Sequence, residues 1–366
     1  MRVLQIANGY LNNKLYTHLF AGLEENRVVD TVFVPIRRGQ AVPQCPENVH
    51  VVPCFNQLDR LFFYRKQKNM LRWLEENLDL QSFDVIHAHT LFSGGYAAYR
   101  IHERLGIPYV VAVRNTDVNS FFKYMVHLRP LGVEIMRHAQ RVVFLSPAYQ
   151  ENVLNKWVPE KYRQELRNKS CVIPNGIAPL FLKEQPLVKE LQQDMLRLIY
   201  VGDINSNKNM ELTVSAIRHL RAQGKNVTLT AIGPIKEEKY SALVKQTDFI
   251  THYDRCPQEE VIEHLRQADI FVMPSHTETF GLVYAEAMSQ GLPVLYTKGQ
   301  GFDGHFPDGT VGYAVSDTDE HQLAEAIIKV TEHYEELSGN GINLVERFDW
   351  RQIARRYVQI YQEVSI

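Results

Sequence analysis

The sequence predicts an α/β protein with two doubly wound domains, each built on a parallel sheet. Short apolar runs rich in β-branched residues alternate with amphipathic stretches of helical period, which is typical of parallel strands buried on both faces. The alternation restarts after a turn-rich segment, so it occurs twice along the chain. The length of 366 residues fits two domains, since a domain holds roughly 100–200 residues.

Each domain is predicted from its own set of apolar runs, and turn residues such as Asn8-Gly9 and Gly202 follow several of them. The first set occupies residues 3–7, 31–34, 84–88, 109–113 and 141–145, and the second set residues 196–201, 227–232, 269–273, 294–296 and 312–315.

Pro174-Asn175-Gly176 and Pro179 mark a turn-rich connection between the two sets. We therefore expect an N-terminal Rossmann-like domain over residues 1–178 and a C-terminal one over residues 179–349. A last helix, at about residues 350–366, carries aromatic and apolar side chains at helical spacing and is expected to pack back on the first domain. Ligands of open parallel sheets bind outside the carboxyl ends of the strands, so the site is expected in a central cleft that both sheets face.

Charge is unevenly distributed along a chain whose formal net charge is only −2. Residues 1–170 hold 22 Lys and Arg against 15 Asp and Glu, whereas the rest of the chain holds 18 against 27. The excess of cations in the first half favours an anionic partner there, although simple solvation also explains it. We expect no nucleic-acid partner.

The first apolar run is too short for a signal peptide, and no stretch approaches the roughly 20 apolar residues of a spanning helix. The four cysteines lie far apart without a Cys-x-x-Cys pair, so neither a zinc site nor a disulfide framework is indicated. These features predict a cytoplasmic protein, either free or peripheral at the inner face of a membrane.

The segment Glu278-Thr279-Phe280-Gly281 follows the predicted strand at 269–273 and leads into a predicted helix at about 281–289. A loop that enters a helix directs free backbone N–H groups and the positive end of the helix dipole at a ligand, which suits a phosphate. Gly281 permits a close approach of the backbone. Glu278 can bind sugar hydroxyls, although an acid that merely starts a helix is the plainer interpretation of a single Glu.

Glu286 lies eight residues after Glu278, beside Leu282, Val283 and Ala285. A Glu among small and apolar side chains needs a partner. A carboxylate at this position can accept both hydroxyls of a ribose.

The Glu-x7-Glu spacing, with Phe280-Gly281 after the first Glu, resembles the family-four retaining glycosyltransferases, and the likeness extends over nearly the whole chain. Pro174-Asn175-Gly176-Ile177 resembles the family's interdomain segment. Tyr200-Val201-Gly202 with Lys208 resembles its phosphate-binding strand end, and Asp308-Gly309-Thr310-Val311-Gly312 resembles a turn late in its second domain. The resemblance implies the GT-B fold, in which two Rossmann-like domains face a central cleft.

The same resemblance implies how the donor is held. Lys208 would bind the donor diphosphate, although without the surrounding pattern a surface loop lysine is the simpler interpretation. Glu286 would bind the ribose. Glu278 and the backbone after it would hold the sugar and the distal phosphate, while Gly9 would approach the transferred sugar or its phosphate. The implied donor-binding residues are Gly9, Gly202, Lys208, Glu278, Thr279, Phe280, Gly281 and Glu286, and the implied catalytic residues are Glu278, Lys208 and Arg114.

Two positions depart from the family pattern. Asp203 stands where the family usually has an Arg, so we expect its side chain to point away from the diphosphate or another cation to take the place of that Arg. The segment Arg114-Asn115 stands where the family often has a His that contacts the transferred sugar. Arg114 is therefore expected to contact a sugar hydroxyl or an anionic acceptor.

Three motifs resemble other kinds of site. Residues 299–304 match the dinucleotide fingerprint Gly-x-Gly-x-x-Gly, but no predicted helix follows, so no NAD site is expected. Asp317-Thr318-Asp319 resembles a metal-binding Asp-x-Asp, yet it precedes a predicted helix at 320–330, where a cap is expected instead. His87 and His89 lack an accompanying carboxylate cluster, so we expect no metal and a structural role for each, with a place in the cleft as the alternative.

Arg65, Lys68 and Arg72 form a stripe at helical spacing within the basic and aromatic stretch 60–73. This stripe could bind a membrane surface or an anionic acceptor. An amphipathic helix with a solvated basic face is the simpler interpretation.

Together with these observations, the resemblance implies a retaining, metal-independent glycosyltransferase without a separate cofactor. It would move a hexose-type sugar from a donor such as a UDP- or GDP-sugar to a saccharide or lipid-linked acceptor in glycan or polysaccharide biosynthesis. The alternatives are a sugar-nucleotide epimerase of the same fold and a non-catalytic nucleotide-sugar-binding subunit.

Overall fold

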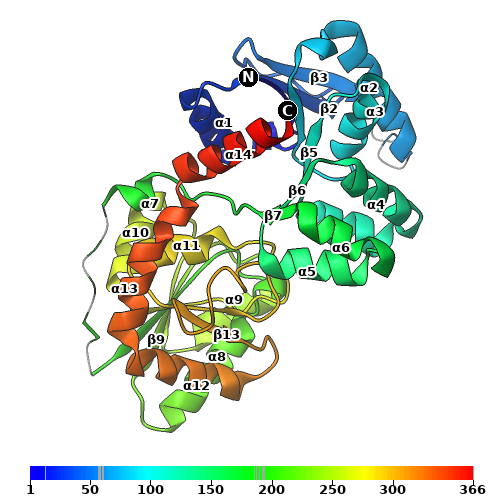
Figure 1. Ribbon diagram of the computed structural model, residues 1–366. Helices are drawn as coiled ribbons and strands as arrows, with labels where there is room; N and C mark the ends of the chain where they lie inside the picture. Colours follow the sequence, from blue (N-terminus) through cyan, green and yellow to red (C-terminus); the bar gives the residue numbers. More distant parts are fainter. Residues whose placement is uncertain are drawn as a thin grey trace. The chain divides into compact units, whose positions relative to one another are not determined.

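The computed structural model describes residues 1–12, 14–56, 59, 62–184, 186, 188, 190–191 and 194–365. Backbone contacts divide the chain into two units, each with one parallel sheet (Figure 1). The first unit comprises Met1–Leu145, Gln150–Pro174 and the chain from Trp350 onward, and the second comprises Ser146–Tyr149 and Asn175–Asp349. The division at residue 174 lies a few residues before the sequence-predicted boundary at 178.

The sheet of the first unit has, among the described residues, seven strands in the order β3-β2-β1-β4-β5-β6-β7, paired in parallel. This is the order of a doubly wound sheet, and it reverses direction between β1 and β4. The strands are β1 Arg2–Ile6, β2 Val29–Arg37, β3 Val49–Phe55, β4 Val85–Ala88, β5 Tyr109–Val113, β6 Arg141–Phe144 and β7 Ser170–Val172.

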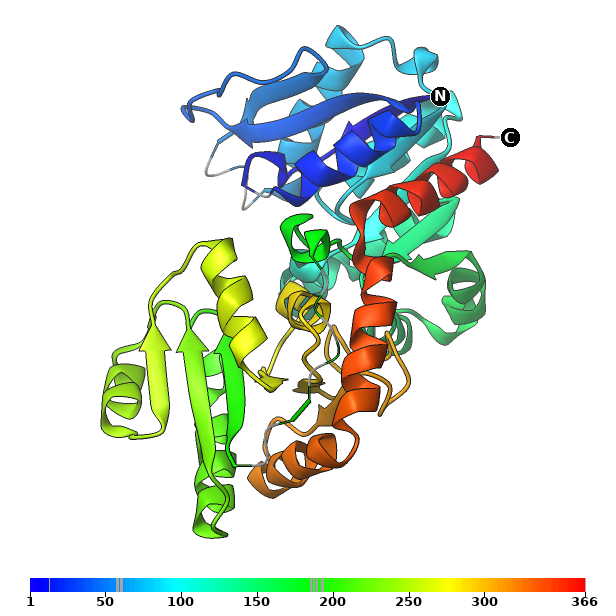
Figure 2. The same cartoon turned by 90° about the vertical axis from the view of Figure 1, so that its left-hand side faces the viewer.

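Helices flank this sheet, and the C-terminal helix α14 (Trp350–Val364) is one of them. Its apolar face, which includes Ile353, Tyr357 and Tyr361, packs with Leu19 and Leu23 of α1 in one core. In Figures 1 and 2 α14 (red) lies beside α1 (dark blue). The helices are α1 Leu15–Glu25, α2 Phe63–Asn77, α3 Gly95–Leu105, α4 Arg129–His138, α5 Pro147–Lys156, α6 Glu160–Lys169 and α14, with the short turns η1 Tyr10–Asn12, η3 Leu80–Ser82, η5 Val126–Leu128 and a π-helical turn, η4 Asp117–Phe122.

The sheet of the second unit repeats the arrangement, with described strands in the order β10-β9-β8-β11-β12-β13 and the reversal between β8 and β11. The strands are β8 Leu196–Val201, β9 Val227–Ile232, β10 Ile250–Tyr253, β11 Ile270–Val272, β12 Val294–Thr297 and β13 Gly312–Val315. The helices are α7 Leu180–Lys183, α8 Met210–Ala222, α9 Glu238–Gln246, α10 Gln258–Gln267, α11 Leu282–Ser289, α12 Glu320–Glu332 and α13 Tyr334–Leu344, with the short turns η6 Ser206–Lys208 and η7 Val345–Phe348.

Every apolar run that predicts a strand contains one, and three further strands were not predicted. The three are β3, β7 and β10, and each lies at an edge of its sheet. None of the three has a continuously buried apolar run, because no side chain of β7 or β10 is fully buried and the exposed Pro53 interrupts β3. The predicted cap at Asp319 is confirmed, because its carboxylate accepts the N–H of Gln322 at 3.0 Å.

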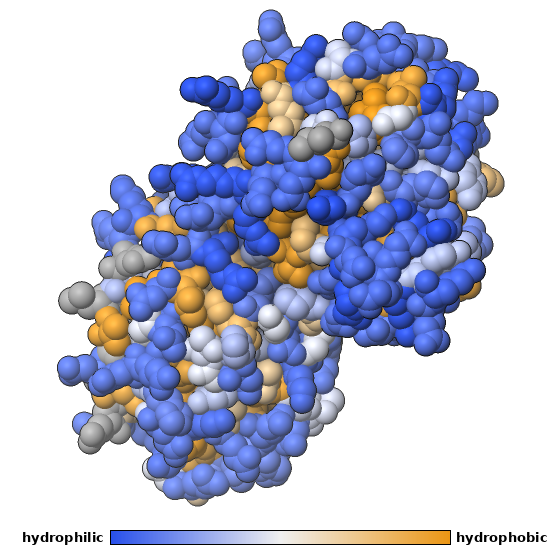
Figure 3. Space-filling model, viewed as in Figure 1, coloured by the Kyte–Doolittle hydropathy of each residue, from blue (hydrophilic) through white to orange (hydrophobic). Residues whose placement is uncertain are grey.

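Across the described residues, no helix is long and apolar enough to cross a membrane. The face of the molecule drawn in Figure 3 is mainly polar, with separate apolar patches on both units. All four cysteines are free thiols.

Candidate functional site

The loops after β8 and β11 begin side by side in the second unit, because these strands are neighbours at the point where the strand order reverses. The carboxyl ends at such a reversal form the usual ligand site of an open α/β sheet. Gly202 directly follows β8 and Lys208 ends η6, while Glu278 lies in the loop between β11 and α11. Topology therefore brings Lys208 and Glu278, which are far apart in the chain, to the same edge of the sheet.

Two asparagines fasten the η6 segment to the loop after β11. The amide of Asn207 donates to Thr277 O at 2.9 Å, and its Oδ1 accepts the N–H of Thr277 at 3.1 Å. The amide of Asn209, a residue with φ of 56°, donates to Pro274 O at 3.0 Å. These bonds fix the backbone on both sides of Lys208.

Lys208 and Glu278 form an ion pair, with 2.5 Å between Nζ and Oε2. Their side chains are 20% and 15% exposed, so the pair is sheltered but reachable by a ligand. The other carboxylate oxygen of Glu278 accepts the N–H of Thr279 at 3.0 Å. The pair presents a fixed positive charge beside a fixed carboxylate.

Gly301, in the glycine-rich stretch after β12, packs closely against the backbone of the loop that holds Glu278. Its N–H donates to Glu278 O at 2.7 Å, and the Gln300 side chain accepts the N–H of Glu278 at 3.0 Å. A Cβ on Gly301 would lie 2.0 Å from the carbonyl carbon of Thr279, so only glycine fits. No helix follows until α12, which confirms that residues 299–304 are not a dinucleotide fingerprint.

The start of α11 offers backbone donors. Gly281 has φ of 74°, a left-handed conformation that turns the chain into the helix at Leu282. The first N–H groups of a helix have no intrahelical acceptor, and the helix dipole adds positive potential there. Phe280 is buried against Phe348, so its backbone rather than its ring faces this region.

Glu286 is partly buried within α11, and its carboxylate makes no hydrogen bond or ion pair with any described residue. Burial alone raises the pKa of Glu286 to about 7. An unpartnered carboxylate in such surroundings costs stability unless a ligand supplies hydrogen-bond donors.

Asp203 makes no ion pair with the described residues; its backbone oxygen accepts the hydroxyl of Tyr200 at 2.9 Å. The structure therefore offers no cation paired with Asp203 in the part of the chain that it describes.

Gly9 and Arg114 lie in the first unit, after β1 and β5 respectively. A Cβ on Gly9 would lie 3.2 Å from Cε2 of Tyr16, so the position is tight. Arg114 donates from Nε to the carbonyl oxygen of His89, at 3.3 Å, in the loop after β4. Both residues thus stand at the carboxyl edge of the first sheet.

His87 and His89 are fully buried, and burial lowers the pKa of each well below its ordinary value. His87 Nδ1 lies 2.6 Å from the hydroxyl of Tyr361 in α14, and His89 Nε2 lies 2.8 Å from Gln5 Oε1. These bonds give both histidines a structural place, and no group of three or more possible metal ligands occurs among the described side chains.

The structure thus collects Gly202, Lys208, Glu278 and the segment 279–281 around one sheet edge of the second unit, with Glu286 in the helix that follows, and places Gly9 and Arg114 in the first unit. Sequence reasoning missed Asn207, Asn209 and Gln300, which hold the loops together. The clustering of asparagines at 205–209 was an available turn signal.

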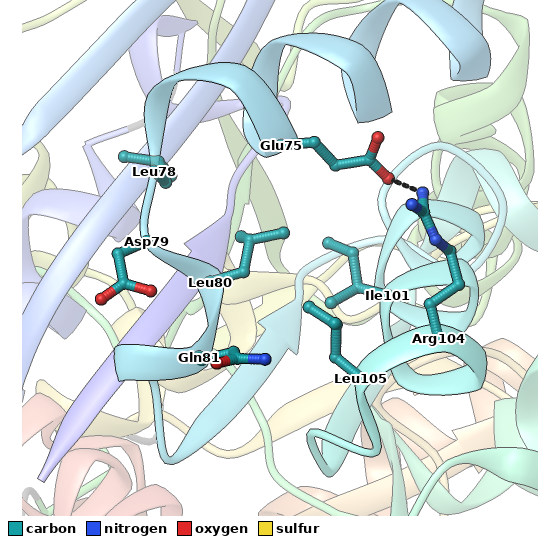
Figure 4. Close-up of a pocket in the computed structure, with 8 residues that line it drawn as sticks. All are labelled: Glu75, Leu78, Asp79, Leu80, Gln81, Ile101, Arg104 and Leu105. Atoms are coloured by element: carbon teal, nitrogen blue, oxygen red, sulfur yellow. Dashed lines mark hydrogen bonds and ion pairs between the residues drawn. The ribbon is translucent and has the colours of Figure 1, made fainter.

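A surface cavity of about 230 Å³ is separate from this site (Figure 4). It lies in the first unit between the C-terminal ends of α2 and α3, bordered by the ion pair of Glu75 and Arg104. The C-terminal ends of crossover helices lead to the amino ends of the next strands, so the cavity stands at the opposite edge of the sheet from Arg114.

Two doubly wound sheets, with phosphate-suited groups at the strand ends of the second, define a protein of the GT-B fold. A family model described as "Glycosyl transferases group 1" matches residues 183–343, and a model described as "Glycosyltransferase Family 4" matches residues 14–179. The chain therefore belongs to the glycosyltransferases of the group 1 and family 4 type, and glycosyl transfer is its enzyme class.

Similar proteins agree with this assignment. The chain is 25% identical to D-inositol 3-phosphate glycosyltransferase of Paenarthrobacter aurescens (strain TC1), over 77% of this chain and 73% of that one. Among solved structures, sucrose-phosphate synthase from Thermosynechococcus elongatus is similar with a TM-score of 0.75 and 19% identity, covering 99% of this chain and 98% of that one. Anabaena Alr3699/HepE, solved in complex with UDP, has a TM-score of 0.71 and 18% identity, covering 99% of this chain and 100% of that one.

Proposed function

We propose that this glycosyltransferase moves a sugar from a nucleoside diphosphate donor to an acceptor hydroxyl, with retention of the anomeric configuration and without a metal ion. The observation that carries the proposal is the arrangement of Lys208, Glu278 and Glu286. One cation is held beside one carboxylate, and a second carboxylate eight residues further on has no described partner. These groups match the diphosphate, the sugar and the ribose of a nucleotide sugar.

The ribose is the chemical match for Glu286, because two neighbouring hydroxyls can donate to the two oxygens of one carboxylate. Hydrogen bonds to a charged acceptor stabilise by about 1.5–3 kcal/mol each. The diphosphate is the match for Lys208 and the first N–H groups of α11. Glu278 would then exchange its bond with Lys208 for the hydroxyls of the transferred sugar.

Negative charge grows on the diphosphate as the bond from the sugar to its phosphate oxygen breaks. Donors that already point at the developing charge lower the barrier, since they need no reorganisation. Lys208 and the α11 backbone supply such donors, which supports a reaction that needs no metal. The acceptor oxygen would bond to the anomeric carbon on the face that the phosphate leaves, and its proton would pass to the departing phosphate oxygen, so no pair of acid and nucleophile carboxylates is required.

The acceptor is proposed to be a saccharide or a lipid-linked saccharide in glycan or polysaccharide synthesis. Arg114, at the carboxyl edge of the first sheet, would contact the transferred sugar or an anionic group of the acceptor. Because a phosphorylated inositol stands in the name of the D-inositol 3-phosphate glycosyltransferase, phosphorylated compounds are the first acceptors to test.

The donor is identified first by thermal shift with UDP-, GDP- and ADP-sugars, beginning with UDP-glucose. The stabilising sugar is then offered with an acceptor panel in the presence of EDTA, and the anomeric configuration of the product is measured by NMR. Retained configuration with undiminished turnover in EDTA is the expected result. An inverted product, or turnover that returns only with added Mg²⁺ or Mn²⁺, would contradict the corresponding part of the proposal.

The same assays separate the two alternatives. Isomerised donor formed without any acceptor would identify an epimerase. Donor that binds but is neither transferred nor hydrolysed with any acceptor would identify a binding subunit.

Peripheral contact with the inner, cytoplasmic face of a membrane is proposed through α2. Tyr64 is 56% exposed, and Arg65, Lys68 and Arg72 are also exposed on this helix; Arg60 and Leu61, from the same basic stretch, lie outside the described residues. Basic and aromatic side chains together suit an anionic lipid surface. Sedimentation with anionic vesicles, lost in Lys68→Glu/Arg72→Glu and absent with neutral vesicles, is the expected result; equal sedimentation of the variant would refute it.

A further inference from the structure

Asp117 is a fully buried carboxylate at the carboxyl edge of the first sheet, and both of its oxygens accept hydrogen bonds from backbone N–H groups. It begins η4, directly after the loop that follows β5. Oδ2 accepts the N–H of Leu91 at 3.0 Å and that of Arg114 at 2.9 Å, and Oδ1 accepts the N–H of Phe92 at 3.1 Å. One side chain therefore binds three backbone groups.

These three groups belong to two different loops. Leu91 and Phe92 follow β4, whereas Arg114 follows β5, and β4 and β5 are neighbouring strands. The rings of Phe92 and Phe121 are stacked, with centroids 4.6 Å apart, which adds a second link between the loops. Asp117 therefore links the loops at the carboxyl ends of two neighbouring strands.

Arg114 is held both through its backbone and through its side chain. Its N–H binds Asp117, and its Nε donates to the carbonyl oxygen of His89 in the loop that Asp117 holds in place. Burial raises the pKa of the Tyr357 phenol, and the neighbouring Arg114 guanidinium opposes that rise, so the cation lies near Tyr357 as well. A guanidinium fixed in this way has little conformational freedom left to lose when a ligand binds.

A buried carboxylate is a costly way to connect two loops, because the charge is removed from water. Burial raises the pKa of Asp117 to about 6, and the three N–H bonds and Arg114 oppose that rise, so the group is still mainly ionised at pH 7. A buried polar group whose hydrogen bonds are satisfied makes the surrounding structure rigid.

We propose that Asp117 is a positioning residue for glycosyl transfer, which fixes the guanidinium of Arg114 for contact with substrate oxygen atoms. The inference rests on the proposed function, because it takes Arg114 as a substrate-binding residue. Asp117 itself touches no substrate. Its effect on the reaction passes through Arg114, which it holds directly and through the loop that carries His89.

A double-mutant cycle tests this dependence on Arg114. Asp117→Asn keeps the shape but has one acceptor oxygen in place of two, and it should lower kcat by ~10- to 100-fold through misplacement of Arg114. In an Arg114→Ala background the same change should alter kcat less than about twofold, since the positioned group is already gone. Equal effects in both backgrounds would overturn the proposal.

Asp84→Asn, at an exposed position, is the control. Asp84 also accepts a backbone N–H, that of Arg2 at 2.7 Å, but it precedes β4 at the opposite edge of the sheet. It should leave kcat and both KM values unchanged. Loss of activity in Asp84→Asn equal to that in Asp117→Asn would show a general folding effect and contradict positioning.

A measurement without turnover separates this inference from the proposed function. The side-chain Nε–H signal of Arg114, assigned by its disappearance in Arg114→Ala, should show in the wild-type protein an order parameter close to that of rigid backbone, about 0.85. A value below about 0.6 would overturn the proposal even if transfer is observed, and the result does not depend on whether Asp117→Asn folds. A rigid Arg114 in a protein that transfers no sugar would support the fixed geometry of Arg114. It would refute only the proposed function.

Discussion

Replacing Glu286 by Gln is expected to stabilise the free protein and to weaken donor binding, two effects of opposite sign. The pKa of Glu286 is about 7 in the folded protein against 4.5 ordinarily, because of burial. An acid whose folded pKa is raised holds more protons when folded, so stability falls as the pH rises from about 4.5 to about 7 and stays low above it. Removing the ionisable group removes this fall.

The magnitudes follow from the same observation. Each pKa unit corresponds to about 1.4 kcal/mol, so partial exposure leaves a gain on the order of 1–3 kcal/mol for Glu286→Gln above pH 7. The amide keeps one acceptor but loses the charge, so the complex should weaken by about 2–3 kcal/mol, roughly 30- to 150-fold in Kd.

Two assays read these effects. Urea unfolding of both proteins between pH 4.5 and 8 should give free energies of unfolding that agree at the acid end and diverge toward pH 7. Calorimetry with the stabilising nucleotide sugar should show wild-type affinity rising through pH 7, since the donor prefers the ionised carboxylate, and a flat profile for Glu286→Gln. Glu325→Gln, an exposed Glu of α12 in the same unit, is the control and should change neither quantity. A Kd within twofold of wild type for Glu286→Gln would refute its assignment to the ribose, and a stability difference independent of pH would refute the burial argument.

Three further changes have expected outcomes. Lys208→Met should lower kcat by about 10²- to 10³-fold, because a preorganised donor to the leaving diphosphate is lost; a drop confined to KM in steady-state kinetics would contradict this. Gly301→Ala should destabilise the protein by more than about 2 kcal/mol, because its Cβ would lie 2.0 Å from a backbone atom of Thr279. The control Gly339→Ala, whose nearest contact is at 3.7 Å, should not lower the midpoint of thermal unfolding. Equal midpoints for the two variants would contradict the close approach at Gly301. Tyr361→Phe should cost about 1–2 kcal/mol in chemical unfolding by leaving its buried histidine partner without a hydrogen bond; an unchanged free energy of unfolding would show that the bond is not needed.

Much of the fold could be predicted from local sequence because a central parallel strand is buried on both faces. The runs that form β1, β4, β5 and β12 are almost continuously apolar, which leaves few other structures open to them. The edge strand β10 escaped prediction because Ile-Thr-His-Tyr alternates partly buried with exposed side chains, and only its neighbour β9 makes it a strand.

For the candidate site, too, local sequence predicts some residues, whereas other contacts depend on the tertiary structure. The sequence by itself predicted Glu278, Gly281 and Glu286 as site residues, because a loop, a turn glycine and a carboxylate on an apolar helix follow one another within one short segment. It could not determine that Lys208 pairs with Glu278, that Gly301 lies against the backbone of Thr279, or that Asp117 joins two loops. Those contacts join residues from different βα units, and only the order of strands in a sheet brings the ends of such units together. The tertiary structure also decided that Glu286 has no partner of its own among the described residues, a property that depends on every neighbour the fold places around it and on no single stretch of chain.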